Sequence, residues 1–122
     1  MAGTITTSLS VSIVNGNFVE DFSLGPAVIA QSAVGGGNPG TVSVTTSEGD
    51  ITISLSTPGM IVIENLDSTN YVQYGPKSGG AMIPFAKIKP LQWHKFALDG
   101  SVTLRAKANT ATVKLRIRAY ED

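Results

Sequence analysis

The sequence contains no cysteine. Disulfides, thiolate metal sites, cysteine nucleophiles and thiol redox chemistry are therefore excluded. Small secreted domains are often disulfide-bonded, so this absence favours folding in a reducing cytoplasm. Residues 1–14 lack the basic start and continuous apolar core of a signal peptide. No apolar run approaches the ~20 residues that a membrane helix requires. We expect a soluble protein made in the cytoplasm, with no membrane partner.

Lysine and arginine are absent from residues 1–76, which carry six acidic residues. Residues 77–122 carry all nine basic residues against three acids, so the formal net charge is +0. A net charge near zero favours self-association over mutual repulsion. Two interpretations stay open. Folding mixes the two charges within one molecule, or the halves of neighbouring copies attract each other.

Histidine is almost absent, since His94 is the only one. Nucleophilic catalysis needs a nucleophile, a base and an orienting group within hydrogen-bond reach. Trp93 and His94 should face opposite sides of a strand. We expect the larger apolar ring to face the core, which leaves His94 as a surface imidazole. The sequence therefore predicts no enzyme, no catalytic residue and no cofactor.

Metal ligands are equally sparse. One histidine without cysteine excludes the common zinc sites. The acidic loops at 46–50 and 67–70 lack the ordered carboxylate spacing of a calcium loop. Asp and Asn in such turns usually bond their own backbone. We predict no metal site.

Aromatic residues make up only 7% of the chain. Trp93, Tyr71 and Tyr74, with Tyr120, could still form a platform on which a sugar ring stacks. Each of these rings also has an ordinary place in a core or at a sheet edge. A carbohydrate-binding module is therefore kept as an alternative of another class.

Alternation of apolar with polar residues is what the sequence does have. It runs through residues 8–13, 42–45, 51–56, 102–107 and 113–120, and period two is typical of half-buried antiparallel strands. Gly-, Pro- and Asn-rich turns separate these segments. We predict one all-β domain over residues 1–122, an antiparallel β-sandwich of nine or ten strands with no substantial helix. A jelly roll fits best, and an Ig-like sandwich is second.

Two segments could reach beyond this domain. Residues 1–8 could be an extended N-terminal arm that reaches a neighbouring subunit, because termini are ordered only when something ties them down. The glycine-rich run at 35–40 could be a flexible arm, or more simply a mobile loop tip.

The last two predicted strands carry a concentrated positive charge. If residues 108–111 form the turn of a hairpin, Arg105 lies opposite Lys114, and five basic side chains of the two strands share the outer face. These are Arg105, Lys107, Lys114, Arg116 and Arg118. Like charges across a strand pair cost a few tenths of a kcal/mol each. The face is either solvated or covered by an acidic protein surface. Nucleic acid is disfavoured by the zero net charge and by the lack of interleaved aromatics.

The C-terminal half has a recognisable pattern of strands and turns. The stretches NLDSTNYVQYG (65–75), IPFAKIKPLQW (83–93) and VTLRAKANTATVKLRIRAYED (102–122) resemble small β-domain structural proteins of tailed bacteriophages. Those proteins carry an Asn-Leu-Asp-x-Thr-Asn-Tyr-Val hairpin, a Lys-Pro-Gly turn and a terminal alternating strand pair. One departure is Leu91, which stands where glycine is common in the Lys89-Pro90 turn.

This resemblance implies a virion component. Such domains decorate or cement the capsid, or form part of tails and fibres, and are often trimers. It implies a capsid decoration protein assembled in the host cytoplasm, whose partners are the major capsid protein and its own copies in a homotrimer. A tail, fibre or head–tail connector protein is the structural alternative.

Overall fold

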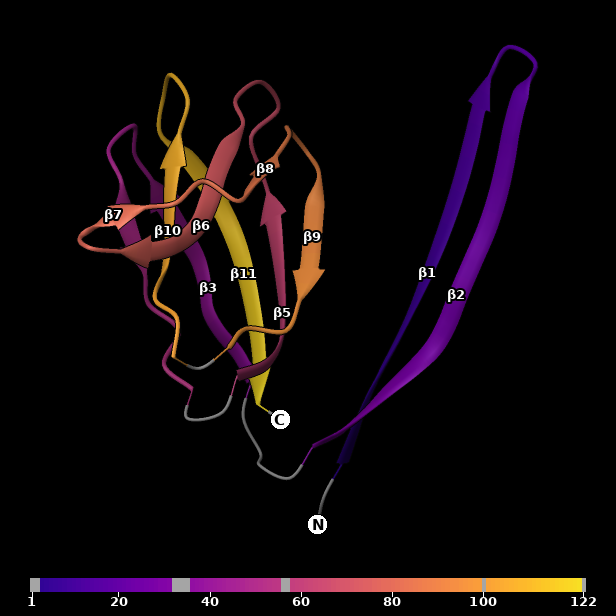
Figure 1. The fold of residues 1–122 in the computed structure, drawn as a ribbon, viewed down its shortest axis with the longest axis horizontal. Coiled ribbons are helices and arrows are strands. Elements are labelled where there is room, and N and C mark those ends of the chain that lie inside the picture. The colour runs from indigo at the N-terminus through magenta and orange to yellow at the C-terminus, as the bar shows by residue number, and fades with distance from the viewer. Residues whose placement is uncertain (1–2, 32–35, 56–57, 100, 122) are drawn as a thin grey trace. The chain divides into compact units, whose positions relative to one another are not determined.

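The computed structural model describes residues 3–31, 36–55, 58–99 and 101–121. These residues form eleven strands and no helix, and every strand pair is antiparallel (Figure 1). The predicted all-β antiparallel fold is thus confirmed. The sequence predicts one domain over 1–122, whereas the contacts divide the chain into two compact units. We call the strand pair at residues 3–31 the hairpin and residues 36–121 the body.

The hairpin consists of β1 (Gly3–Asn15) and β2 (Phe18–Gln31). Gly16 begins its two-residue loop with φ of 58°, a positive value that the II′ type of hairpin turn places at this position. Gly25-Pro26, a dipeptide typical of turns, has a cis peptide bond and forms a bulge inside β2 that shifts the register between Thr7 and Leu9. Residues 3–7 are paired with β2 and Ser8 lies at the bulge, so the described part of the expected 1–8 arm belongs to this hairpin.

The register gives the hairpin two unlike faces. Cross-strand partners lie on the same face of an antiparallel pair, and the pairs Ile5–Ile29, Leu9–Leu24 and Val11–Phe22 therefore share one side. Ile13 and Phe18 extend this side to the tip, where Glu20 is its acidic member. The opposite side is mostly Ser, Thr and Asp21. We call the first side the apolar face of the hairpin. It is defined by Ile5, Leu9, Val11, Ile13, Phe18, Phe22, Leu24, Ala27 and Ile29.

The body contains two sheets. One has the order β3-β11-β5-β9, with β3 at Gly36–Val44, β11 at Val113–Glu121, β5 at Pro58–Asn65 and β9 at Trp93–Phe96. The other runs β4-β10-β6-β7 with β8 also beside β6, and its strands are β4 (Gly49–Ile51), β10 (Leu104–Ala108), β6 (Val72–Ser78), β7 (Ala81–Met82) and β8 (Ala86–Ile88). In Figure 1, β11 in yellow runs through the middle of its sheet.

A nested set of pairs joins strands far apart in the sequence. β3 pairs with β11, β4 with β10, β5 with β9 and β6 with β8. The short β7 aside, the first body strand meets the last, the second meets the seventh, and so on inward. The pairs β5–β11 and β6–β10 then close the two sheets.

One hydrophobic core fills the space between the sheets. Ile61, Ile63, Val113, Leu115 and Ile117 come from the first sheet, and each has 0% of its surface exposed. Alternate residues of β6 and β10, together with Ile88 of β8, join the same cluster. The alternation predicted for residues 102–107 and 113–120 is therefore confirmed as inward-facing apolar side chains.

The predicted hairpin of β10 and β11 is wrong, because these strands lie in different sheets. Both strands turn their apolar residues toward the core, so they face each other across it instead of pairing edge to edge. Arg105 lies beside Asp50 and Gly75, while Lys114 lies beside Ser43. The expected single basic face does not exist.

The glycine-rich run is also not a loop tip. Residues 36–40 belong to β3 and pair with β11 from Ile117 to Tyr120, while Gly35 lies outside the described residues. Pro39 is tolerated because β3 is at the edge of its sheet, where a missing N–H breaks no second ladder.

The Asn-Leu-Asp motif of the resemblance builds a connected turn. The buried Asn65 donates from Nδ2 to Asn70 O at 2.8 Å and to Ile88 O at 3.1 Å, and its Oδ1 accepts from the Asp67 amide at 2.9 Å. Asp67 in turn accepts from the amides of Thr69 and Asn70. These bonds lower the pKa of the Asp67 carboxyl. The motif thus fixes the β5–β6 connection.

Candidate interaction surfaces

The five predicted interface residues divide between the two sheets. Arg105 and Lys107 lie on the outer side of β10, and Lys114, Arg116 and Arg118 on the outer side of β11. Arg105 is engaged inside the body, where its Nε lies 2.9 Å from Asp50 Oδ1 and its Nη1 lies 3.3 Å from Glu48 Oε1 and 2.9 Å from Gly80 O. Hydrogen bonding to Arg105 lowers the pKa of Asp50. Arg105 therefore fastens β4 and the β6–β7 turn to β10.

Glu48 and Asp50, the two acids of the 46–50 loop, are engaged in the same network. Glu48 Oε1 accepts from the Met82 amide at 2.7 Å, which is the main reason that the pKa of Glu48 is lowered. Lys77 lies 3.6 Å from Asp50. No cluster of three or more His, Asp or Glu residues that could hold a metal occurs in the part of the chain that the structure describes.

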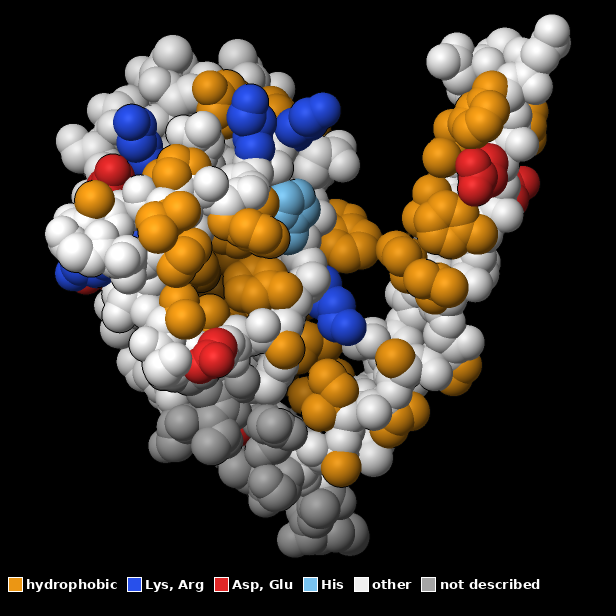
Figure 2. All heavy atoms as spheres, viewed as in Figure 1, with side chains coloured by type: hydrophobic (Ala, Val, Ile, Leu, Met, Phe, Trp, Pro, Cys, Tyr) orange, Lys and Arg blue, Asp and Glu red, His pale blue; other side chains and the backbone are white. Residues whose placement is uncertain are grey.

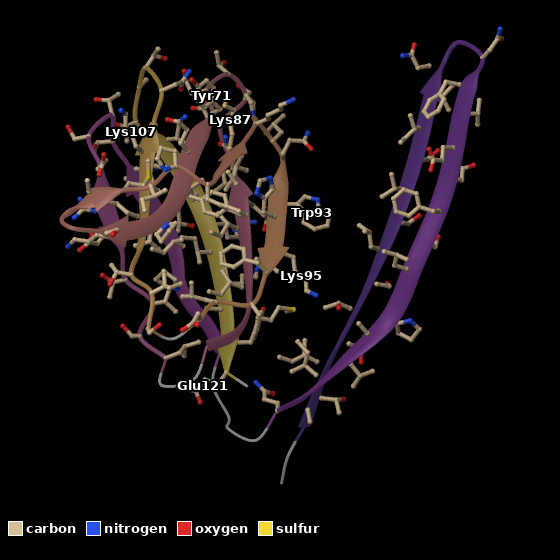
Figure 3. The ribbon with its side chains drawn as sticks, in the orientation of Figure 1. Tyr71, Lys87, Trp93, Lys95, Lys107 and Glu121 are labelled. Carbon is tan, nitrogen blue, oxygen red and sulfur yellow. The ribbon has the colours of Figure 1, made fainter. Side chains whose placement is uncertain are left out.

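The outer side of the β3-β11-β5-β9 sheet forms a second surface, which we call the β11 face. It is defined by Trp93, Lys95, Lys114, Arg116 and Arg118, with Glu64 among them. The register places Arg116, Glu64 and Trp93 in one row across three strands, and Arg118, Val62 and Lys95 in the next. Arg118 forms an ion pair with Glu64. Figure 3 shows Trp93 and Lys95 projecting from β9 on the same side.

The orientation expected for β9 is wrong. Trp93 is 55% exposed, whereas His94 and Phe96 turn toward the inner side of the sheet. His94 Nδ1 lies 2.8 Å from the Tyr74 hydroxyl, and the two rings are 5.6 Å apart. Burial lowers the pKa of His94 and raises that of Tyr74. Ring size was a poor guide because His94 finds both a polar partner and ring contacts inside.

An apolar groove opens beside this pair, between β9 and the edge formed by β6 and β8. Its volume is about 710 Å³, and it is lined mainly by Tyr74, Phe85, Phe96, Leu98, Val102 and Leu104, with His94 and Lys95. Figure 2 shows hydrophobic side chains gathered on this face of the body, with the single histidine at their margin. Tyr74 stacks on Phe96 at 5.8 Å and meets Phe85 edge-on at 6.4 Å.

The groove offers apolar contact instead of a catalytic constellation. Its described lining contains no carboxylate, serine or threonine to act with His94. Phe85 stands 78% exposed at its rim. Such a lining suits apolar side chains with one or two polar groups among them.

The predicted glycan platform is not formed as a unit. Tyr74 is only 5% exposed inside the groove. Tyr71 lies at the start of β6 under the Lys87 ammonium, 4.2 Å from its ring centre, and Trp93 stands on the β11 face (Figure 3). Of the three, Trp93 presents the most open ring.

Sequence reasoning missed the groove and the apolar face of the hairpin. The alternation in residues 8–13 signals a strand with one apolar side, but a pattern does not show whether anything covers that side. No helix able to cross a membrane occurs among the described residues. No protein-family model, curated protein or solved structure matches this chain.

Proposed function

We propose that this chain is a non-enzymatic structural protein of a tailed-phage virion, a capsid decoration protein that binds across neighbouring capsid subunits through its β11 face. The observation that carries the proposal is an exposed tryptophan set in a cationic sheet surface. Interface centres are enriched in Trp, Tyr and Arg, and hot spots concentrate in those residues. The partner that fits is an acidic protein surface.

A strained residue beside Trp93 supports this assignment. Leu91 has φ of 60° and is 65% exposed. It occupies the third position of a turn closed by the Gln92 amide on Lys89 O, where glycine would be unstrained. Strain of about 1–2 kcal/mol at a non-glycine residue points to a function for the side chain. An exposed leucine two residues before Trp93 adds an apolar side chain that a partner can contact.

We assign the body to the jelly-roll class of β-sandwiches. A jelly roll is an eight-stranded double sheet of two Greek keys, found in viral capsid and lectin domains. The nested pairing of β3–β11, β4–β10, β5–β9 and β6–β8 supports it. Fold alone does not assign function, but this class suits both a virion protein and a sugar binder.

The test is to measure the chain in purified virions by quantitative mass spectrometry. A decoration protein is present in proportion to the major capsid protein, whereas a tail, fibre or connector protein is present in a few fixed copies. Absence from virions would overturn the virion assignment.

The binding surface is tested on capsid shells by co-sedimentation. Arg116→Glu should weaken binding on the order of tenfold, because it places like charges against an acidic partner. Lys107→Glu makes the same charge change on the other sheet and should leave binding unaltered. Wild-type binding should weaken as salt rises, since exposed charges are screened. Equal effects of both variants would exclude the β11 face.

A carbohydrate-binding module is the second candidate, and the exposed ring of Trp93 favours it. Glycan-array binding that Trp93→Ala abolishes would support this function. Absence of binding on glycan arrays together with intact capsid binding would exclude this function.

A further inference from the structure

The hairpin cannot be stable with its apolar face in water. An isolated two-stranded ribbon is marginally stable at best, and stability requires a further strand or a packed face. No described residue of the hairpin is buried. Phe18 and Leu24, both on this face, are 56% and 59% exposed. Something must cover this face in the working protein.

The unpaired edges of the hairpin also indicate that something covers it. No other described strand pairs with the outer edge of either long strand. Native proteins protect such edges with lysines, prolines or covering segments. The hairpin carries no lysine or arginine, and its charges are Glu20 and Asp21. The Gly25-Pro26 bulge interrupts β2, but most of the length of both edges has neither a proline nor a basic residue.

The covering surface cannot be the body of the same molecule alone. β1 has 13 residues, which corresponds to about 40 Å at ~3.3 Å per residue. A body of this size is about 30 Å across, from the usual scaling of radius with length. The edge strand beside the groove, β9, has four residues. A hairpin folded back along its own body would therefore leave part of its apolar face uncovered.

Bundling of hairpins around a symmetry axis is disfavoured by Glu20. This residue lies opposite Ile13 on the apolar face. In a symmetric bundle the Glu20 carboxylates of all copies would meet in an apolar centre, and buried like charges are costly. Docking on a body avoids this clash. Residues 36–121 carry nine basic and six acidic residues, whereas the hairpin carries two acids and no base.

We propose that the hairpin of one copy docks into the β9 groove of a second copy, with Phe22 and Leu24 entering the groove and the hairpin edge extending the sheet beyond β9. β9 pairs only with β5 among the described residues, so its other edge accepts a strand. This arm-to-groove contact is heterologous, and it closes into a ring when the rotation between copies allows. It uses a different surface from the β11 face.

The experiment uses two matched pairs of variants of the full chain. Leu24 and Val28 are 59% and 60% exposed on opposite faces of β2. Leu24→Ser should abolish self-association, and Val28→Ser should preserve it. In the body, Phe85→Ser at the groove should abolish it, while Ile83→Ser outside the lining should not. Molar mass is measured by light scattering after gel filtration, and body folding by circular dichroism.

Complementation decides between the possible occupants. Leu24→Ser keeps an intact groove and Phe85→Ser keeps an intact arm, so a mixture of the two should form a heterodimer and nothing larger. Loss of association in Leu24→Ser but not in Phe85→Ser would show that hairpins bundle with each other and would overturn the proposal. A wild-type chain that stays monomeric at high micromolar concentration would overturn it as well. Arg116→Glu should leave the molar mass unchanged, which separates this proposal from capsid binding.

Discussion

The hairpin and the body use the same strand alternation with opposite results. In the body, alternate residues of β11 lose all contact with solvent because a second sheet faces them. In the hairpin, Leu9, Ile13 and Phe22 alternate just as regularly yet remain exposed. Alternation therefore specifies which side of a strand is apolar, and the arrangement of other elements decides whether that side is buried. The comparison predicts that the two regions respond differently to the same kind of change.

The largest difference is expected for leucine truncation. Leu115→Ala removes a fully buried side chain from β11 and should destabilise the body by about 2–5 kcal/mol. Leu9→Ala makes the same chemical change in the hairpin and should alter body unfolding by less than about 0.5 kcal/mol. Urea unfolding followed by far-ultraviolet circular dichroism measures both. Equal losses would show that hairpin and body unfold as one cooperative unit, against the comparison.

A smaller effect is expected at two glycines. A Cβ added to Gly75 would lie 1.9 Å from Ile83 O and 2.8 Å from Phe85 N, both backbone atoms. Gly75→Ala should destabilise the body by about 1–3 kcal/mol or more, because the groove edge must move. Gly16 has open space around it and only its positive φ to satisfy, so Gly16→Ala should speed amide exchange in the hairpin alone. Hydrogen exchange that spreads to β10 or β11 in Gly16→Ala would contradict the division.

The body alone contains a described non-glycine residue with positive φ, Leu91. Leu91→Gly should relieve the strain and stabilise the body by about 0.5–1 kcal/mol, net of the added chain entropy. Leu91→Asn should give a smaller gain in the same direction, because asparagine tolerates this conformation. Thermal unfolding checks both. A gain accompanied by weaker capsid binding would link the retained leucine to the β11 face, whereas a loss of stability would show that its side chain packs within the body.

The smallest effect concerns pH and the groove. Burial lowers the pKa of His94 below its ordinary value of 6.5, so the unfolded chain takes up this proton at a higher pH than the folded one. The contribution of neutral His94 to the free energy of unfolding is therefore complete above about pH 6.5. It is lost as the pH falls from there toward the pKa of His94 in the folded protein. Wild type should lose more stability than His94→Gln between about pH 7.5 and pH 5.5. Hairpin amide exchange should show no such difference, and identical pH profiles of the two proteins would contradict the partial burial of His94.

Local pattern predicted much of the fold and little of the site. The sidedness of Val113 to Ala119 follows from alternation alone, and it was confirmed. The partner of each strand did not follow, because neighbours in sequence need not be neighbours in a sheet. Arg105 was therefore placed beside Lys114, whereas its contacts are Asp50 and Glu48. The turn at Leu91 shows the converse. The sequence marked the departure from glycine, and the backbone there does adopt the conformation that glycine favours.

The nested strand pairing also has a consequence for the order of folding. A two-stranded ribbon such as β1–β2 closes over a two-residue loop and can form within microseconds. The body behaves differently, because β11 follows all its other strands in the sequence yet lies between β3 and β5. Closing that sheet requires contacts of long sequence separation, which are slow to form. While the chain is being synthesised, β3 and β5 remain without their shared partner until β11 has emerged. Until then their unpaired edges are open to aggregation, which chaperones or rapid closure of the sheet would prevent.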